Sequence, residues 1–282
     1  MLSIDAHQHF WRIARGDYAW MDDSVSRIRK DYLPQDLAAL TKPLGIDGTV
    51  VVQAAATVEE TEFLLSLADA TDWILGVVGW VDLERPDVEE TLVRLAKNPR
   101  FKGIRPMLQD IPDTGWILKP AVLKSLSKVA ELGLRLDALV TPRHLENLAK
   151  LAATLPDLPI AIDHCAKPEI AAGQDAGDNW RAAMARLAAY PQVHCKLSGL
   201  ANEYGEGWSA QTLKPVFDHV VSIFGPDRLM WGSDWPVLEL SGRYDDWFAT
   251  AASMARDLDP VARQALFGGT ATRFYKLKGM SQ

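Results

Sequence analysis

The chain has 282 residues, of which 48% are hydrophobic and 24% are charged, a composition that argues against disorder and fibrous structure. Its net charge of -7, from 30 Lys and Arg against 37 Asp and Glu, has the wrong sign for a surface that neutralises phosphates, so no nucleic acid partner is expected. The longest apolar run, residues 74–81, is well short of the roughly 18 residues that a membrane-spanning helix needs, so no membrane association is expected.

The first residues carry neither a basic segment nor a long apolar segment, so no secretion signal is predicted and a cytoplasmic location is expected. The two cysteines, Cys165 and Cys195, cannot build a disulfide framework and are predicted to be reduced core residues. We expect a monomer or a homodimer.

Short apolar or β-branched runs recur along the chain, each followed by a polar loop and then a stretch with helical periodicity. One such stretch has apolar residues at spacings of three and one between Leu213 and Phe224, and another begins where Thr141 and Pro142 supply an N-cap and a first helical residue. This alternation predicts parallel strands joined by crossover helices. The runs predicted as strands are residues 2–9, 48–53, 74–81, 103–107, 134–140, 160–163, 193–197 and 229–232.

Eight strands alternating with helices predict the α/β class and, within it, a (β/α)8 TIM barrel. No linker or internal repeat marks a boundary, so residues 1–282 are expected to form a single domain. A doubly wound open sheet would usually carry a glycine-rich phosphate loop after its first strand, whereas this first strand ends in histidines. In a barrel the active site lies at the carboxyl ends of the strands, so polar residues at these ends are the candidate site residues.

The first predicted strand ends with His7 and His9, two residues apart. Because side chains alternate between the faces of a strand, both imidazoles point the same way and can converge on one ligand. His164 follows the sixth strand and Asp234 the eighth. Taken singly, His164 could be a core histidine and Asp234 a cap, but a buried carboxylate needs a partner such as histidine or a metal. Together, the four residues predict one catalytic site.

Charged and aromatic residues also follow or occupy the strands. Arg105 and Lys196 are expected to bind an anionic or carbonyl oxygen of a substrate. Asp137 either lines the pocket or pairs with Arg135 or another cation of the barrel. Trp11 and Trp235 lie just beyond apolar runs and are expected to form a wall against which a ring can lie.

Several blocks, in this order along the chain, resemble the amidohydrolase superfamily, in the branch of sugar lactonases that act on L-fuconolactone and L-rhamnonolactone. The resemblance runs nearly from end to end. Its blocks are residues 4–11 (IDAHQHFW), 77–83 (VVGWVDL), 102–105 (KGIR), 163–168 (DHCAKP), 196–199 (KLSG) and 231–236 (WGSDWP).

The resemblance implies a site that either binds a metal or uses the same residues without one. This chain, however, departs from the superfamily pattern. Where the superfamily has a histidine on the fifth strand and often a carboxylated lysine on the fourth, this chain has Asp137 and Arg105. A binuclear centre is therefore not expected. One divalent ion such as Zn²⁺, held by His7, His9 and Asp234, remains an option, as does a site that works without metal.

Opening a lactone requires an activated water, a stabilised oxyanion and a protonated leaving alkoxide. Asp234 is the predicted base, and the histidines, directly or through a metal, are predicted to polarise the carbonyl. The predicted function is therefore hydrolysis of an aldonic acid lactone of the L-fuconolactone or L-rhamnonolactone type. Two alternatives are a metal-dependent decarboxylase or hydratase of the same superfamily and a catalytically silent barrel that binds a sugar acid.

Overall fold

Eight parallel strands form one sheet in the computed structural model, which describes residues 2–278. Each strand pairs with the next along the chain, in the order β1 to β8. The strands are β1 (Ile4–Gln8), β2 (Gly48–Val52), β3 (Ile74–Gly79), β4 (Phe101–Ile104), β5 (Arg135–Ala138), β6 (Ile160–Ile162), β7 (Val193–Leu197) and β8 (Leu229–Trp231).

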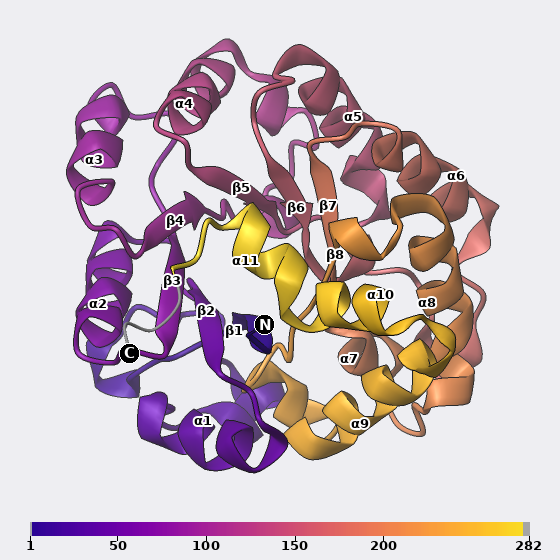
Figure 1. Cartoon of the computed structure of the whole chain (residues 1–282). Coiled ribbons are helices and arrows are strands. Elements are labelled where there is room, and N and C mark those ends of the chain that lie inside the picture. The colour runs from indigo at the N-terminus through magenta and orange to yellow at the C-terminus, as the bar shows by residue number, and fades with distance from the viewer. Residues whose placement is uncertain (1, 279–282) are drawn as a thin grey trace.

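The two edges of the sheet meet where the chain leaves β1 and β8. The backbone N–H of His9 donates to the carbonyl of Trp235, and that of Asp234 donates to the carbonyl of His7, each with an N–O distance of 2.7 Å. These bonds close the sheet, so the predicted (β/α)8 barrel is confirmed (Figure 1). That residues 1–282 form a single domain stays a prediction.

Helices surround the barrel and lie between the strands in sequence (Figure 1). The predicted helix at 213–224 is confirmed as part of α8, and α5 follows a short 3₁₀ turn at Pro142–His144. Among the described residues, no helix has both the length and the apolar character needed to cross a bilayer. The helices are α1 (Pro34–Thr41), α2 (Val58–Asp69), α3 (Val88–Leu95), α4 (Pro120–Glu131), α5 (Leu145–Thr154), α6 (Gly177–Ala188), α7 (Leu200–Tyr204), α8 (Ala210–Phe224), α9 (Tyr244–Met254), α10 (Pro260–Gln264) and α11 (Thr270–Phe274).

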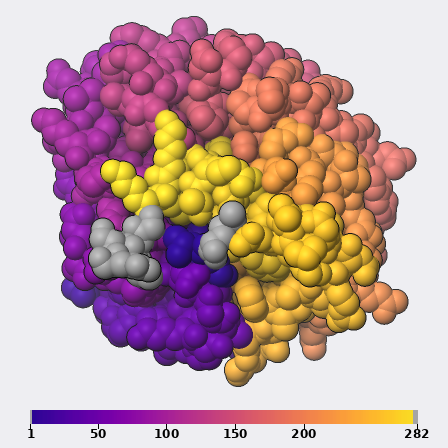
Figure 2. All heavy atoms as spheres, viewed as in Figure 1, coloured from indigo at the N-terminus to yellow at the C-terminus, as the bar shows by residue number. Residues whose placement is uncertain are grey.

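Both faces of the strands are buried, as expected for a parallel sheet covered by helices. One apolar layer lies between the strands and the outer helices, and a smaller one fills the barrel interior with residues such as Val50 and Met230. Phe274 and Tyr275, at the end of α11, belong to this interior layer. Helix α11 therefore covers the barrel end at which the strands begin (Figures 1 and 2). The opposite end is left for the site.

A bulge in β1 decides where its histidines point. Ile4 and Ala6 belong to the interior layer, so strict alternation would turn His7 toward the outer helices. The pairing with β2 shifts between Asp5 and Gln8, which inserts one extra residue into β1. The extra residue reverses the alternation, and His7 then faces the interior.

Seven of the eight strands end earlier than predicted, and only β7 keeps its predicted end; two of the early ends affect the site. β4 spans Phe101–Ile104 rather than 103–107, because Pro106 has no N–H with which to continue the ladder. β6 ends at Ile162, and the next four residues form a tight turn. Arg105 therefore follows its strand directly, whereas His164 lies within a turn.

A buried carboxyl group holds the loop between β2 and α2. Glu60 has no exposed surface and accepts a hydrogen bond from the N–H of Ala54 at 2.9 Å, while its other oxygen has no partner among the described residues. Burial raises the pKa of Glu60 to about 8. The folded chain therefore retains a proton that the unfolded chain, with its ordinary pKa of 4.5, loses.

This proton makes the free energy of unfolding depend on pH. Because the folded pKa is raised, the stabilising contribution is complete below about pH 4.5 and is lost progressively as the pH rises to about 8. Glu60→Gln imitates the protonated acid, so the variant should gain stability over the wild type by a few kcal/mol, to an order of magnitude, between pH 5 and pH 9. Urea unfolding at both pH values measures this. Glu59→Gln, at an exposed position on the same helix, is the control, and equal pH slopes for wild type and Glu60→Gln would contradict the expectation.

Candidate active site

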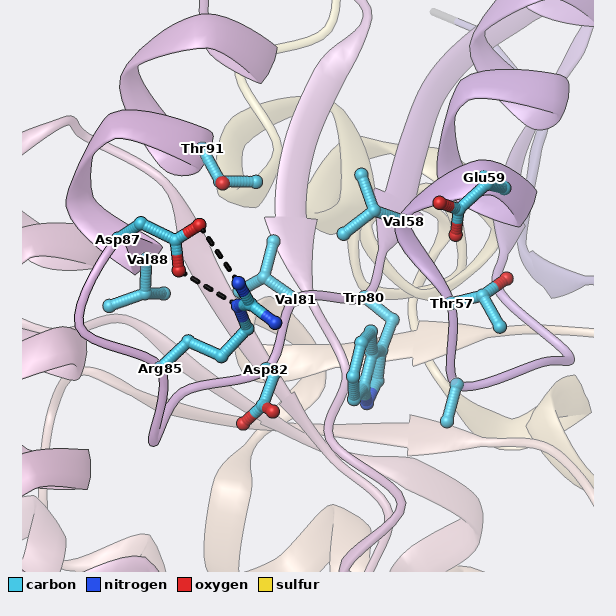
Figure 3. Close-up of a pocket in the computed structure, with 11 residues that line it drawn as sticks. Thr57, Val58, Glu59, Trp80, Val81, Asp82, Arg85, Asp87, Val88 and Thr91 are labelled. Carbon is cyan, nitrogen blue, oxygen red and sulfur yellow. Dashed lines mark hydrogen bonds and ion pairs between the residues drawn. The ribbon is translucent and has the colours of Figure 1, made fainter.

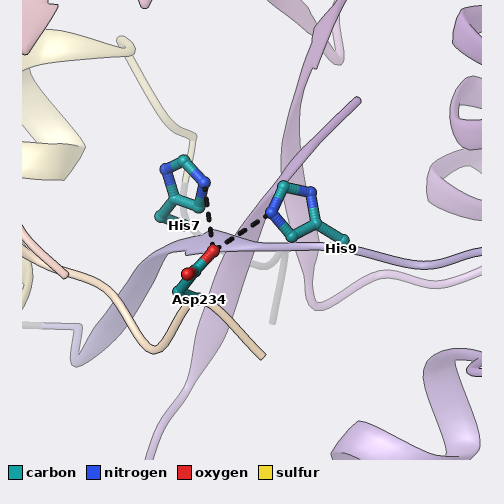
Figure 4. A group of neighbouring side chains, drawn as sticks. All are labelled: His7, His9 and Asp234. Carbon is teal, nitrogen blue, oxygen red and sulfur yellow. Dashed lines mark hydrogen bonds and ion pairs between the residues drawn. The ribbon is translucent and has the colours of Figure 1, made fainter. Parts of the chain in front are cut away.

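Three histidines and one aspartate meet at the barrel end where the strands finish. The Oδ1 atom of Asp234 lies 3.2 Å from Nε2 of His9, 3.7 Å from Nε2 of His7 and 3.9 Å from Nε2 of His164. All four residues are buried. Figure 4 shows the first two imidazoles directed at the same carboxylate oxygen. The structure thus brings together the four residues predicted from strands one, six and eight.

The turn after β6 projects His164 into this site. Four successive residues, His164 to Lys167, have positive φ, a conformation that side-chain-bearing residues adopt rarely and mostly at functional sites. The imidazole Nδ1 lies 2.9 Å from the hydroxyl oxygen of Ser198. A Cβ at Gly199 would lie 2.6 Å from that Nδ1 atom, so glycine is required for the ring to fit. The glycine after Ser198 therefore belongs to the site.

The electrostatic environment keeps the aspartate charged and His164 neutral. Burial alone would raise the pKa of Asp234, but His164, His9 and His7 together outweigh burial and hold the pKa well below its ordinary value. Burial lowers the pKa of His164 to about 4. At ordinary assay pH, Asp234 is therefore a carboxylate and His164 an uncharged imidazole.

The cluster of His7, His9 and Asp234 fits a divalent cation. Nδ1 of His9 lies 2.8 Å from the carbonyl oxygen of Val52, which can only accept, so this nitrogen carries a proton. In a neutral ring the lone pair of Nε2 then faces the Asp234 carboxylate at 3.2 Å. Two electron-rich atoms at this distance need a proton or a cation between them. Imidazole and carboxylate are ligands that Zn²⁺ accepts, and one ligand atom from each residue lies within 4.8 Å of the others.

Lys196 and Asp137 do not line the cavity in which these groups lie. Both side chains are completely buried and pair with each other, with 2.5 Å between Nζ and Oδ2. Nζ also lies 3.1 Å from Oδ1 of Asp163 and 3.1 Å from Nδ1 of His7. The structure thus resolves the two readings of Asp137 in favour of pairing with a barrel cation. It places Lys196 beneath the site, where direct contact with a substrate is not available.

Arg105 does reach the cavity, and it is held by the barrel interior. One guanidinium nitrogen donates to the carbonyl of Gln53, and another lies 3.6 Å from Oδ2 of Asp163. Burial would raise the pKa of Asp163, but Lys196, His7 and Arg105 outweigh it and hold the pKa well below its ordinary value. Asp163 is therefore a carboxylate between cations, a role that the sequence analysis did not assign. The sequence feature that could have indicated this role is the position of Asp163 directly before His164 at the end of a strand.

The cavity above the cluster has a volume of about 240 Å³. One part of its wall is apolar and another part is polar, and Trp11 lines it as predicted. Several lining residues were not predicted. Lys167 lies three residues after His164 in the same turn, Met107 and Leu139 end two of the predicted strand runs, and most of the others come from loops. The lining residues are His9, Trp11, Trp20, Val25, Ala54, Arg105, Met107, Gln109, Asp110, Leu139, His164, Lys167, Asp234, Val237 and Leu240.

Trp235 does not line the cavity. Its side chain is buried, and its indole N–H donates to Oε1 of Glu239 at 2.9 Å. Its ring packs edge to face against Tyr32, which in turn packs against Trp11. Trp235 thus supports the aromatic wall from behind.

A second hollow, of about 430 Å³, lies beside the first turns of α2 and α3 (Figure 3). The ring of Trp80 borders it, and Arg85 pairs there with Asp87 at 2.8 Å. None of the histidines lines it. Of the four predicted catalytic residues, His9, His164 and Asp234 line the smaller cavity, whereas His7 is buried behind Asp234 and does not line it.

Histidines and an aspartate at the carboxyl ends of the strands place the ligands that zinc enzymes use at the end of a (β/α)8 barrel where active sites lie. The model of the amidohydrolase family matches residues 4–277, and the chain belongs to this family, as the sequence predicts.

The chain is similar to two proteins named L-fucono-1,5-lactonase. It is 45% identical over 278 residues to the one from Burkholderia ambifaria, covering 97% of this chain and 95% of that protein. It is 36% identical to the one from Burkholderia multivorans, covering 98% and 96%. A crystal structure of an amidohydrolase from Burkholderia multivorans with bound zinc superposes with a TM-score of 0.92 at 36% identity, covering 99% of this chain and all of that one.

Proposed function

We propose that this chain hydrolyses a sugar lactone by attack of water on the ring carbonyl, with L-fucono-1,5-lactone as the leading candidate substrate. One observation carries the proposal: the ionised Asp234 stands among three imidazoles, at a cavity with both apolar and polar walls. The two Burkholderia relatives named for this lactone match almost the full chain and support the predicted activity. They favour neither the decarboxylase or hydratase alternative nor the silent barrel.

The chain's own residues provide the groups that the reaction needs. Asp234 orients the water and accepts its proton as the new C–O bond forms, and it returns that proton to the ring oxygen when the ester bond breaks. When the Ser198 hydroxyl donates to Nδ1 of the neutral His164, Nε2 carries the ring proton and can donate it to the carbonyl oxygen. Arg105 adds a fixed positive charge near the developing oxyanion.

The donor set of His7, His9 and Asp234 would hold a Zn²⁺ ion in this chain, as the zinc-containing Burkholderia multivorans structure suggests. Such an ion, when bound, polarises a carbonyl and lowers the pKa of water. A lactone is an ester, whose carbonyl reacts readily with water. The proton transfers described for Asp234 are therefore the same whether or not an ion is bound.

Only residues that line the cavity are proposed to contact the substrate. Trp11 and Arg105 keep their predicted binding roles as proposals, because both line the cavity. Gln109, Asp110 and Lys167 offer hydrogen bonds to hydroxyl groups of the sugar. Lys196, Asp137 and Trp235 receive no substrate contact in this proposal. The absence of a nucleic acid partner, the oligomeric state and the cellular location stay predictions.

Hydrolysis of a panel of lactones tests the proposal. We expect acid release, followed with a pH indicator, from five- and six-carbon sugar lactones, with the highest kcat/KM for L-fucono-1,5-lactone or a close relative. The same assay with and without added Zn²⁺ measures the metal requirement. Activity confined to amides or phosphate esters would contradict the proposed class.

A further inference from the structure

We propose, on the basis of the lactonase function above, that Tyr275, Asp137 and Lys196 form a buried positioning chain that orients the imidazole of His7. This positioning chain runs from the barrel end covered by α11 to the floor of the catalytic cavity. None of its three members lines that cavity. They would act on the reaction only through His7.

Each link of the positioning chain is a direct contact. The hydroxyl of Tyr275 donates to the carboxylate of Asp137, with distances of 2.9 and 2.8 Å to the two oxygens. Nζ of Lys196 donates to the same carboxylate at 2.5 Å and lies 3.1 Å from Nδ1 of His7. All four residues are buried, with at most 1% of their surface exposed. Solvent therefore screens these contacts very little.

Three acceptor groups lie around the ammonium of Lys196. An ammonium group has three N–H donors and no acceptor. Three acceptor groups surround Nζ: the carboxylates of Asp137 and Asp163 and the Nδ1 atom of His7. A buried ammonium without such partners would be strongly destabilising. The position of the Lys196 ammonium is therefore fixed by its contacts with the two carboxylates and the imidazole.

This position of Lys196 dictates how the His7 ring is used. An ammonium can only donate, so a hydrogen bond from Nζ requires Nδ1 of His7 to accept, and the proton of a neutral ring then lies on Nε2. Nε2 then faces Asp234 Oδ1 at 3.7 Å, on the cavity side. Arg105 approaches Nε2 at 3.4 Å, but a neutral imidazole accepts at one nitrogen only, and the lysine is closer. The ring is thus oriented with one defined nitrogen toward the reacting groups.

Asp163 can stabilise the other tautomer of His7, in which the ring proton lies on Nδ1. Its Oδ1 atom lies 3.2 Å from Nδ1 of His7, close enough to accept a proton from that nitrogen. If Nε2 ligates a cation, its proton must leave, and a proton on Nδ1 then finds Asp163 as its acceptor. The positioning chain therefore favours the Nε2-protonated ring in metal-free protein.

Tyr275→Phe tests the proposal, because it removes one hydroxyl and keeps the ring that packs in the interior. Loss of an indirect partner of this kind typically costs about 10-fold in activity. We expect kcat to fall by about this factor with KM unchanged, since Tyr275 lies away from the cavity. Asp137→Asn keeps the side-chain shape, and we expect a change in the same direction.

Nitrogen chemical shifts of the histidine rings provide a readout that needs no substrate. In protein dialysed against a chelator, we expect the Nδ1 of His7 to resonate as unprotonated and its Nε2 as protonated. In Tyr275→Phe the two signals should move toward each other as the tautomers mix. Comparison with the spectrum of His7→Gln assigns the signals among the six histidines of the chain.

Tyr244→Phe is the matched control, because Tyr244 is also buried and donates its hydroxyl to a buried carboxylate, Asp5, at 2.8 Å. It should lose comparable stability yet leave the His7 signals in place. A protonated Nδ1 in the metal-free wild type, or equal changes in kcat and in the His7 signals for both tyrosine variants, would overturn the proposal. If the wild type hydrolyses no lactone, the proposed function fails, whereas the nitrogen shifts still decide the orientation of His7.

Discussion

Asp234→Asn is expected to lower kcat for the lactone by about 10²- to 10⁴-fold, the usual effect of removing a general base, with little change in KM. Asparagine keeps the shape of the side chain but cannot take a proton from water. The loss should be in kcat because the group acts while the water is attacking and not while the substrate binds. Initial rates over a range of substrate concentrations measure both parameters.

Asp110→Asn provides a comparison within the same cavity. Asp110 lines the wall but is not one of the groups around the Asp234 carboxylate. If it binds a sugar hydroxyl, its loss should chiefly raise KM. Measurement of bound metal in both variants separates a lost base from a lost ligand. A full kcat in Asp234→Asn with unchanged metal content would rule out Asp234 as the base.

Lys196→Met is expected to destabilise the fold by about 3–5 kcal/mol, the usual cost of removing one partner of a buried ion pair. The ammonium pairs with Asp137 and Asp163, and neither side chain has exposed surface. Its removal leaves the buried carboxylate of Asp137 without a cation and leaves Asp163 with Arg105 alone. Denaturant unfolding at neutral pH measures the change in free energy. This expectation differs from the one that the sequence suggested, in which Lys196 binds an anionic or carbonyl oxygen of the substrate.

Lys214→Met is the control for this measurement. Lys214 pairs with Asp218 at 2.7 Å, but about half of each side chain is exposed. An exposed pair on a helix contributes about 0.3–0.5 kcal/mol, so this variant should retain nearly full stability. A Lys196→Met protein as stable as Lys214→Met, with a raised KM as its only defect, would restore the role in substrate binding.

The amino-acid sequence determined the architecture and brought together the four residues that we propose as catalytic groups. Alternation of apolar runs with helical stretches predicts eight strands, and strand order follows chain order because each crossover helix returns to the neighbouring position. In such a barrel the carboxyl ends of all strands lie at one end. Residues as distant as His7 and Asp234 can therefore be placed together without knowledge of their contacts.

Two residues that were predicted to bind substrate lie away from the cavity for the same reason. Lys196 and Asp137 lie on strands and face the interior, as the predicted cavity residues should. The sequence pattern gives the face on which a strand residue lies but not its height along the barrel axis. The position of a residue along the barrel axis decides whether it lines the cavity or lies in the layer below it. In that lower layer the two charges meet each other and Tyr275 instead of a substrate.

Other features depend on contacts between segments far apart in the chain. The bulge that turns His7 inward arises from the pairing of β1 with β2, and Trp20, Gln109 and Asp110 reach the cavity from loops without periodicity. Such loops take their shape from the barrel on which they rest. The sequence by itself thus determined the barrel and the convergence of three histidines and an aspartate at the carboxyl ends of its strands, because both follow from local periodicity. Only the tertiary structure decided which charges line the cavity, because burial and pairing depend on neighbours that are distant in sequence.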